Sequence, residues 1–381
     1  MKVVGKIKDA CIVIAGQSPS GASYNDNGVG MEFHQGKKAF GESFIEHSNV
    51  WTTEITKIAE PGDILMSVRA PVGPTNLTDR KICIGRGLAA IRCNKTVIPA
   101  YILYALRNIE SEIIGNDGAV FNSINKKQIE ELPLPLLSLS EQQRIVDYLD
   151  SVFAKIDAMK ANAEKALNEA KALFQASLKE MLEPKEGWEE KEFGKLCNFV
   201  RGPFGGSLKK ECFKDSGYAV YEQQNAIYNK FTFRYFIDEE KYKSLYRFKV
   251  NSGDLIMSCS GTIGKVAIIP EDFKKGIINQ ALLKLTPNKD TDAHFLKYLM
   301  ESNYFKEIIN ANIEGVAIKN IASVAILKEI KLYIPKVSEQ QKIVTTLDSL
   351  KSKVDHLQEN YNKISQECDA LKQAILRQVF E

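Results

Sequence analysis

The sequence predicts an α+β protein built from two β-rich domains and two long helices in a pseudo-two-fold internal repeat. Three observations lead to this fold class: a repeated pair of motifs, two segments with heptads of apolar residues, and short strand-like runs bounded by turn residues. At roughly 150 residues per domain, 381 residues can hold two domains and a further element. The hydrophobic fraction of 44% and the charged fraction of 26% exclude a disordered, collagenous or disulfide-scaffold chain.

The internal repeat sets the order of the domains. EQQRIVDYLD at 141–150 matches EQQKIVTTLD at 339–348, and PGDILMSVRAPVG at 61–73 matches SGDLIMSCSGTIG at 252–264. Because both motifs recur in the same order, the chain has the arrangement A-B-A′-B′. The predicted boundaries are 1–138 for the first β-rich domain, 139–183 for the first long helix, 184–336 for the second β-rich domain and 337–381 for the second long helix.

Both β-rich domains show strand-like runs before a helix. Runs such as GDILMSV, GLAAIRC, GYAVYE and GDLIMSC are rich in β-branched and aromatic residues and are bounded by Gly, Asn or Asp. PAYILYALRNIESEII and DAHFLKYLMESNYFKEII then carry apolar residues at helical spacing. Each domain therefore ends with a helix and a closing strand that leads into the long helix.

The long helices carry apolar residues at alternating spacings of four and three, which predicts a coiled coil. Two such seams in one register imply that the helices pack together; the alternative is that each packs on its own domain. Ser140 and Ser338 are the expected N-caps, and Pro184 ends the first helix. The predicted seam residues are Ile145, Leu149, Val152, Ile156, Met159, Ile343, Leu347, Leu350, Val354 and Leu357.

The sequence lacks the common catalytic and cofactor motifs. It contains no HExxH, no P-loop, no GxSxG and no glycine-rich dinucleotide turn, which favours a non-catalytic protein that binds no metal or cofactor of its own. Seven cysteines without a CxxC pair fit a reducing compartment. The first apolar run is too short for a signal peptide or a membrane span. We therefore expect a cytoplasmic protein that does not enter a membrane.

The net charge of +3 hides an uneven distribution. Residues 1–135 carry 15 basic and 14 acidic side chains, and residues 189–335 carry 22 and 18. The two helical segments are −2 and neutral, so the β-rich domains are the basic parts. Basic, amide and aromatic residues cluster in HQGKK at 34–38, RGPFGGSLKK at 201–210 and EQQNAIYNKFTFRY at 222–235.

These clusters predict contacts with double-stranded DNA, since amides and arginine can read base edges and lysines contact phosphates. An ordinary solvated loop is the alternative for each cluster, and structural hydrogen bonds are the alternative for Arg69 and Arg86. Two different readers separated by a coiled coil would fit an asymmetric, two-part target. The candidate residues are Gln35, Lys37, Lys38, Arg69 and Arg86 in the first domain, and Lys209, Lys210, Gln223, Gln224, Asn225, Thr262 and Lys265 in the second.

The repeated motifs resemble those of the specificity subunits of Type I restriction-modification systems. The resemblance rests on the EQQRIV and EQQKIV helix starts, the preceding PLPLLSLS and YIPKVS segments, and the paired GDILMSVRAPVG and GDLIMSCSGTIG segments. It covers essentially the whole chain. In this family two target-recognition domains are joined by two conserved helices that form an antiparallel coiled coil, and the subunit itself is not an enzyme.

The resemblance also implies partners. Two methyltransferase subunits would bind S-adenosylmethionine and methylate adenine, and restriction subunits would bind ATP and Mg. The exposed positions of the long helices, including Gln142, Gln143, Gln340 and Gln341, would dock the methyltransferase subunits.

Two other functions are open at this point. One is a coiled-coil structural or regulatory protein that binds DNA without sequence preference and has no methyltransferase partner. The other is a self-sufficient DNA methyltransferase, but the sequence has neither a cofactor-binding motif nor an Asn/Asp-Pro-Pro-aromatic motif.

Overall fold

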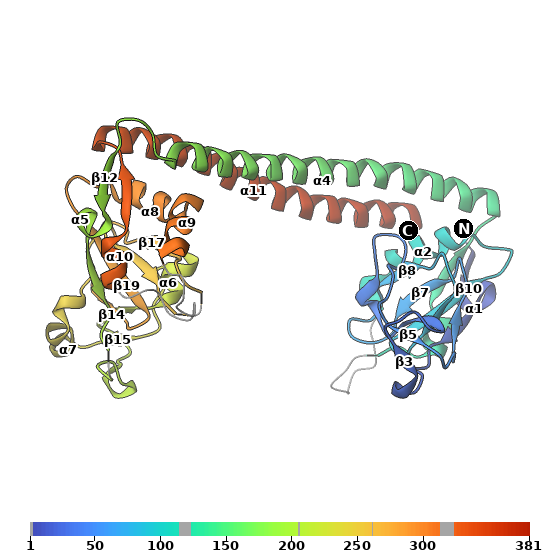
Figure 1. Cartoon of the computed structure of the whole chain (residues 1–381). Helices are drawn as coiled ribbons and strands as arrows, with labels where there is room; N and C mark the ends of the chain where they lie inside the picture. The colour runs from blue at the N-terminus through green and yellow to red at the C-terminus, as the bar shows by residue number, and fades with distance from the viewer. Residues whose placement is uncertain (1–2, 114–122, 205, 261, 313–323) are drawn as a thin grey trace. The chain divides into compact units, whose positions relative to one another are not determined.

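The computed structural model of the chain describes residues 3–113, 123–204, 206–260, 262–312 and 324–381 (Figure 1). These residues form two compact units. Unit 1 comprises residues 1–164 and 361–381, and unit 2 comprises residues 165–360. Each unit therefore holds one β-rich domain together with a part of both long helices.

Unit 1 contains two main sheets and a two-stranded ribbon. The larger sheet has the strand order β3-β5-β4-β9-β6, in which β4 and β9 run parallel, and the other sheet has the order β2-β10-β7-β8. The ribbon pairs β1 with β11 directly before the long helix α4. The bounds are β1 (Val3–Lys6), α1 (Ile7–Ala10), β2 (Cys11–Ala15), β3 (Tyr24–Asn25), β4 (Met31–His34), β5 (Trp51–Thr52), β6 (Ile58–Ala59), β7 (Ile64–Ser67), β8 (Thr75–Leu77), β9 (Ile82–Ile84), β10 (Leu88–Cys93), α2 (Pro99–Asn108), α3 (Lys126–Glu130), β11 (Pro133–Leu136) and α4 (Leu139–Leu182).

Unit 2 repeats this arrangement with fewer strands. Its four-stranded sheet has the order β13-β19-β16-β17, its second sheet has the order β15-β14-β18 with β14 parallel to β18, and β12 pairs with β20 before α11. The bounds are β12 (Glu189–Glu192), α5 (Phe193–Leu196), β13 (Cys197–Arg201), β14 (Tyr218–Tyr221), α6 (Gln223–Tyr228), β15 (Phe236–Ile237), α7 (Glu239–Ser244), β16 (Leu255–Ser258), β17 (Val266–Ile268), β18 (Gly276–Ile278), β19 (Leu282–Pro287), α8 (Ala293–Glu301), α9 (Asn303–Asn312), α10 (Val324–Glu329), β20 (Lys331–Ile334) and α11 (Val337–Phe380).

The registers of the two units correspond residue by residue. His34 is paired with Ile84 in unit 1, and Tyr221 is paired with Ile278 in unit 2. β10 pairs with both β2 and β7, as β19 pairs with both β13 and β16. The internal repeat and the α+β fold class are therefore confirmed at the level of strand topology.

The main core of each unit lies between its four-stranded sheet, the helix that follows the sheet and the long helices. In unit 1, α2 contributes six consecutive buried residues, which pack with residues of β7 and β10 and with the start of α4. The same cluster includes Cys368, Leu376 and Phe380 of α11. In unit 2, Phe295 and Leu299 of α8 pack with Leu347 of α11. The long helices are therefore parts of the cores as well as of a coiled coil.

The two long helices run antiparallel within each unit. In unit 1, Lys160 forms an ion pair with Asp369 at 3.3 Å, and Lys372 forms one with Asp157, so the numbering rises along α4 as it falls along α11. In unit 2, the Lys171 ammonium donates to the Gln358 amide oxygen at 2.7 Å. Figure 1 shows α4 in green beside α11 in red. The antiparallel pairing predicted from the family resemblance is confirmed.

The predicted N-caps are wrong by two residues. The helix α4 begins at Leu139 because Ser138 caps it: its hydroxyl accepts from the Glu141 N–H at 3.3 Å, while its own N–H donates to the Glu141 carboxylate at 3.1 Å. Ser140 therefore lies inside the helix. At the start of α11 the equivalent position is Lys336, whose carbonyl accepts from Gln340 N–H at 3.0 Å, and Ser338 lies within that helix.

The predicted seam residues are buried or half-buried throughout α11, and in α4 they are so except for Met159. Ile343, Leu347 and Val354 are buried, Leu350 and Leu357 are half-buried, and so are Ile145 and Val152. Leu149 and Ile156 are buried as expected, but Met159 is 61% exposed. Phe153 and Leu167 of α4 are buried and Lys160 is half-buried, and each of them lies one residue after Val152, Ala166 and Met159, respectively.

Candidate nucleic-acid interface

Four loops of unit 1 meet where β4 and β9 end. Because these strands are parallel, their carboxyl ends reach the same edge of the sheet. Backbone hydrogen bonds fasten the loops together there: Gly85 N–H donates to His34 O at 2.8 Å, Gly16 N–H to Leu88 O at 2.9 Å and Val68 N–H to Gly87 O at 3.0 Å. We call residues 16–18, 35–38, 68–69 and 85–87 the loop edge of unit 1.

All five residues predicted to contact DNA in the first domain lie on this loop edge. Gln35 follows β4, and its amide oxygen accepts from the Ser18 hydroxyl at 2.9 Å. The same hydroxyl accepts from Arg86 N–H at 3.2 Å, which joins three of the loops. The five side chains are exposed, and the four cations among them form no ion pair with another described residue: Gln35, Lys37, Lys38, Arg69 and Arg86.

Unit 2 builds an equivalent edge with the same three backbone hydrogen bonds. Asn279 N–H donates to Tyr221 O at 2.9 Å, Gly202 N–H to Leu282 O at 3.0 Å and Cys259 N–H to Ala281 O at 2.9 Å. The loop edge of unit 2 consists of residues 201–204, 222–224, 258–259, 262–265 and 279–281. It holds four of the predicted residues: Thr262 and Lys265, which are exposed, and Gln223 and Gln224, which are half-buried.

Asn225 was predicted to contact bases, but its side chain is 1% exposed. Its amide oxygen accepts from Glu222 N–H at 2.7 Å, and its amide nitrogen donates to the carbonyls of Lys230 and Thr232. The side chain therefore holds the turn that starts α6, and the prediction that it reads bases is wrong. Lys209 and Lys210 are exposed, as predicted, but belong to the segment between the loop edge and β14.

The loop edges also contain residues that the sequence alone did not single out. Gln17 in unit 1 and Gln280 in unit 2 are exposed, and Arg201 and Phe204 begin the segment from which Lys209 and Lys210 were chosen. A signal for this edge was present, because a glycine stands at the root of the first loop in both repeats. A Cβ atom on Gly16 would lie 2.2 Å from the Gly85 carbonyl oxygen, and one on Gly202 would lie 1.8 Å from that of Asn279.

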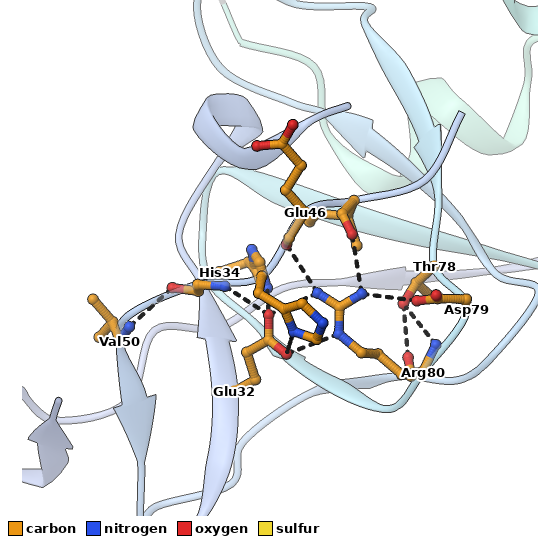
Figure 2. A network of polar contacts seen from close by, with 10 residues as sticks. Glu32, His34, Glu46, Val50, Thr78, Asp79 and Arg80 are labelled. Atoms are coloured by element: carbon orange, nitrogen blue, oxygen red, sulfur yellow. Dashed lines mark hydrogen bonds and ion pairs between the residues drawn. The ribbon is translucent and has the colours of Figure 1, made fainter. Parts of the chain in front are cut away.

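Behind the loop edge of unit 1 lies a buried network of polar groups (Figure 2). Glu32 of β4 is 4% exposed and accepts from the Arg80 guanidinium through two bonds of 2.8 Å. The remaining N–H groups of Arg80 donate to the carbonyls of Ile45 and Glu46 and to the Asp79 carboxylate, so that all five guanidinium donors are satisfied. The arginine thus ties β4 to the two segments that flank it.

Histidine completes this network. His34 Nε2 lies 2.8 Å from Glu32 Oε1, and Ser48 N–H donates to the same oxygen at 2.7 Å. Burial alone would raise the pKa of Glu32, but hydrogen bonds from Arg80, Ser48 and His34 outweigh it and hold the pKa at about 2. Burial lowers the pKa of His34 below its ordinary value. The network therefore consists of an ionised glutamate, an arginine and a neutral histidine, and it stabilises the strand that presents Gln35.

The equivalent strand of unit 2 is supported by aromatic packing. The repeat places Ala219 at the position of Glu32 and Tyr221 at the position of His34. Tyr221 is fully buried, its ring lies 4.8 Å from that of Phe233, and its hydroxyl donates to the Lys274 carbonyl at 2.7 Å. Burial raises the pKa of this tyrosine, so it stays neutral.

Gln142 and Gln340 anchor the long helices and are not exposed docking residues as predicted. Both side chains are 0% exposed. Gln142 accepts from Ile98 N–H at 2.8 Å and donates to the carbonyls of Thr96 and Leu137 at 3.1 and 2.9 Å. Gln340 makes the same three bonds, to Asp292 N–H and to the carbonyls of Asp290 and Pro335, with the same three distances. A buried amide satisfies three backbone groups in each unit, which explains why glutamine recurs there.

The second glutamine of each EQQ motif is exposed. Gln143 and Gln341 point to solvent on the next face of their helices, and Gln143 donates to the Asp147 carboxylate at 2.8 Å. A second repeated contact fixes each helix on its domain: the Tyr104 hydroxyl donates to Asp150 at 2.5 Å in unit 1, and that of Tyr298 donates to Asp348 at 2.7 Å in unit 2. The inner face of the first turns of each long helix thus binds its own domain, and the outer face is exposed to solvent.

Among the described residues, no helix combines the length and the apolar character that crossing a bilayer requires. No three His, Cys, Asp or Glu side chains of the described ranges gather as metal ligands would.

Comparison with solved structures supports the fold. A chain from a structure titled for complex assembly and conformational transition of the type I R-M system matches with a TM-score of 0.76 at 17% identity, over 100% of this chain and 97% of that chain. The HsdS subunit from Thermoanaerobacter tengcongensis matches with a TM-score of 0.57 at 16% identity, over 99% and 96% of the two chains. At these identities the likeness concerns the fold alone.

Curated relatives are named as specificity subunits. A putative MjaX specificity subunit of Methanocaldococcus jannaschii is 40% identical over 155 residues, which are 40% of this chain and 36% of that protein. The EcoBI specificity subunit of Escherichia coli is 23% identical over 317 residues, 74% and 64% of the two chains. The alignments thus span between about one third and two thirds of these two relatives.

The family model for the Type I restriction modification DNA specificity domain matches residues 2–169 and again residues 185–366. The two matches cover most of the chain and follow its internal repeat, and they confirm the resemblance seen in the sequence. The chain belongs to the family of Type I restriction-modification DNA specificity subunits, which are non-catalytic components.

Proposed function

We propose that this chain is the DNA-recognition subunit of a Type I restriction-modification complex and that its two units read the two halves of an asymmetric, bipartite target in double-stranded DNA. The observation that carries the proposal is the repeated loop edge. The same three backbone hydrogen bonds build it in both units, while its exposed side chains differ. A shared frame with different side chains is what two readers of different half-sites require.

The side chains divide into base-reading and phosphate-binding groups. Gln35 and Arg86 of unit 1 are the candidate base readers, since an amide can bind adenine and a guanidinium can bind guanine in the major groove. Lys37, Lys38 and Arg69 supply positive charge beside them for phosphate contacts. In unit 2, Gln223, Gln224 and Thr262 are the candidate base readers, and Lys209, Lys210 and Lys265 the candidate phosphate contacts.

The proposal includes partner subunits. Two methyltransferase subunits, which bind S-adenosylmethionine, would methylate one adenine in each half-site, and restriction subunits, which use ATP and Mg, would join for cleavage. Docking of the methyltransferase subunits is assigned to the exposed face of the long helices, with Gln143 and Gln341 as its candidate residues. The buried Gln142 and Gln340 are excluded from that role.

The experiment is to map methylated adenines in the genome of cells that co-express this chain and its cognate methyltransferase subunit. The expected result is one asymmetric motif in two parts separated by a fixed spacer, which is absent without the chain. Gln35→Ala and Arg86→Ala should relax one part of the motif, and Gln223→Ala and Thr262→Ala should relax the other. Lys95→Ala and Lys289→Ala are matched controls. These exposed lysines follow β10 and β19, at the ends of those strands that lie away from the loop edges.

A motif without two parts, or a motif unchanged by every loop-edge variant, would contradict the proposal. Methylation that does not depend on this chain would favour instead a DNA-binding structural protein without a methyltransferase partner. Loss of the complex in Gln143→Ala combined with Gln341→Ala, with both units folded, would support the docking assignment separately from target reading.

A further inference from the structure

Phe204 stands out on the loop edge of unit 2 because its side chain is 68% exposed. A phenylalanine normally gains free energy by leaving water, so an exposed ring on a basic surface requires a reason. The residue lies two positions after Gly202, which is fastened to the strand end by its hydrogen bond to Leu282. The ring is therefore presented at the same edge as Thr262 and Lys265.

The root of this loop is built to hold its position. Gly202 and Pro203 are buried, and a Cβ atom on Gly202 would lie 1.8 Å from the Asn279 carbonyl oxygen. Pro203 fixes its own φ angle, and the Ser207 hydroxyl donates to the Phe204 carbonyl at 2.8 Å. Phe204 is thus displayed by a constrained loop root.

A cation accompanies the ring. The Arg201 guanidinium carbon lies 5.9 Å from the centroid of the Phe204 ring. A guanidinium beside an exposed ring can bind a phosphate while the ring contacts bases. The pair combines an apolar wedge with an anion-binding group.

Unit 1 has no such pair at the equivalent place. The repeat aligns Gly16 with Gly202, so Ala15 stands at the position of Arg201 and Ser18 at that of Phe204. Ser18 instead joins Gln35 to Arg86 by hydrogen bonds. The two units therefore place chemically different groups at one position of the same frame.

We propose that Phe204 is a specificity-determining residue that wedges into a base step of the half-site read by unit 2, with Arg201 on an adjacent phosphate. This inference rests on the proposed function. An inserted apolar side chain partly unstacks a base step and kinks the duplex, and pyrimidine–purine steps cost least to deform in this way. The ligand is thus a flexible pyrimidine–purine step, which unit 2 would recognise by its deformability.

The test uses the complex of the full chain with its methyltransferase subunit and duplexes carrying the mapped target. 2-Aminopurine replaces single bases of the half-site for unit 2, at positions other than the methylated adenine. We expect its fluorescence to rise at least threefold at one step on binding of the wild-type complex. Phe204→Ala should abolish the rise and Phe204→Leu should retain part of it, whereas Lys289→Ala, which changes an exposed lysine of unit 2 outside the loop edge, should leave it unchanged.

A second measurement compares binding of targets in which that step is pyrimidine–purine or part of a stiff A-tract. The wild-type complex should discriminate between them by tenfold or more, and Phe204→Ala by less than threefold. The Trp188 fluorescence of each variant verifies that unit 2 is folded. Equal fluorescence profiles and equal discrimination for wild type and Phe204→Ala would overturn the wedge. The proposed function would fail on different results, namely a methylated motif without two parts or a motif that no loop-edge variant changes.

Discussion

Unit 1 supports strand β4 with a buried carboxylate, whereas unit 2 supports the equivalent strand β14 with aromatic rings. In unit 1, Glu32 receives hydrogen bonds from Arg80, Ser48 and His34 behind the loop edge. In unit 2, Ala219 and Tyr221 take the equivalent positions, and Tyr221 packs against Phe231 and Phe233. The glutamine and tyrosine contacts that hold the long helices, by contrast, are the same in both units.

This difference separates two demands on the repeat. Gln142 and Gln340 each join a long helix to its domain with three hydrogen bonds. The three distances of one glutamine equal those of the other, so this joint is the same in both units. The side chains behind the loop edge differ between the units. A buried ionic network supports the parallel strand pair in unit 1, and packed aromatic rings support it in unit 2. Variation is thus concentrated in and behind the surface proposed to read DNA.

The largest expected effect comes from breaking the ionic layer of unit 1. Arg80→Met would leave Glu32 buried without its cation, and removing one member of a buried ion pair costs about 3 kcal/mol. We expect unit 1 to unfold at a lower urea concentration while unit 2 is unchanged. The two tryptophans, Trp51 in unit 1 and Trp188 in unit 2, allow this to be measured unit by unit. Fluorescence of Trp51 alone, in a Trp188→Phe background, reports the shift of the unfolding midpoint of unit 1. Arg80→Lys should give an intermediate shift, because lysine keeps the charge but loses the paired hydrogen bonds.

The next effect tests the part that the units share. Gln142→Leu and Gln340→Leu should each destabilise their own unit by about 2 kcal/mol, because an apolar side chain leaves one buried N–H and two carbonyls unpaired. Hydrogen exchange should lose protection at Ile98 N–H in the first variant and at Asp292 N–H in the second. Gln143→Leu and Gln341→Leu are the matched controls and should leave both amides protected. Unequal losses in the two units would contradict the view that the joints are equivalent.

The sequence predicted the fold class because its evidence is local or repeated. Motifs at matching positions, heptads and strand-like runs are visible without any knowledge of contacts, and they lead to the helices, the domain order and the family resemblance. The seam prediction for α4 was wrong at Met159. Apolar or small residues recur at heptad spacing at Val152, Met159 and Ala166, each one residue before Phe153, Lys160 and Leu167. The inward position is held instead by Lys160, whose ion pair with Asp369 could not be seen in the sequence.

The candidate site shows the same limit. The cations and the amide of unit 1 that were predicted to contact DNA are exposed on one loop edge, and their contact with DNA stays a prediction. Gln142, Gln340 and Asn225 have amide side chains, which are usually exposed. Each of them is nevertheless buried, and its amide hydrogen-bonds to backbone groups. Arg80 and Glu32 are 48 positions apart in the chain, and no spacing rule connects them. Burial of a polar side chain depends on such distant partners, which the sequence does not display.

A third prediction uses pH to separate the two units. The pKa of Glu32 is about 2 in the folded chain against an ordinary value of 4.5, so its stabilising contribution is present above pH 4.5 and is lost as the pH falls toward 2. The lowered pKa of His34 acts in the same direction, because the unfolded chain takes up a proton near pH 6.5 that the buried ring refuses. Unit 2 has neither group at the equivalent positions. The acid transition of Trp51 should therefore lie at higher pH than that of Trp188, each followed in the single-tryptophan variant.

Two variants sharpen this comparison. In Glu32→Gln the dependence of unit 1 on pH between about 4.5 and 2 should become shallower, because the carboxylate that gains protons on unfolding is gone. Glu46→Gln changes an exposed glutamate of the same segment, whose side chain does not enter the network, and should leave the transition where it is. Coincident transitions for the two tryptophans in the wild-type chain would mean that the buried network does not distinguish the units.

The smallest expected effect is that of the arginine in unit 2 that also pairs with a glutamate. Arg234 donates to both oxygens of Glu222 at 2.9 and 3.0 Å, but its side chain is 62% exposed, so water can replace it when it is removed. Arg234→Met should leave the unfolding midpoint of unit 2, followed by Trp188, within experimental error of the wild type. A shift as large as that of Arg80→Met in unit 1 would show that both units depend on an arginine–glutamate ion pair. The contrast between an ionic layer in unit 1 and an aromatic layer in unit 2 would then have to be abandoned. The bidentate geometry of the arginine–glutamate pair, without burial, would explain the loss of stability in both variants.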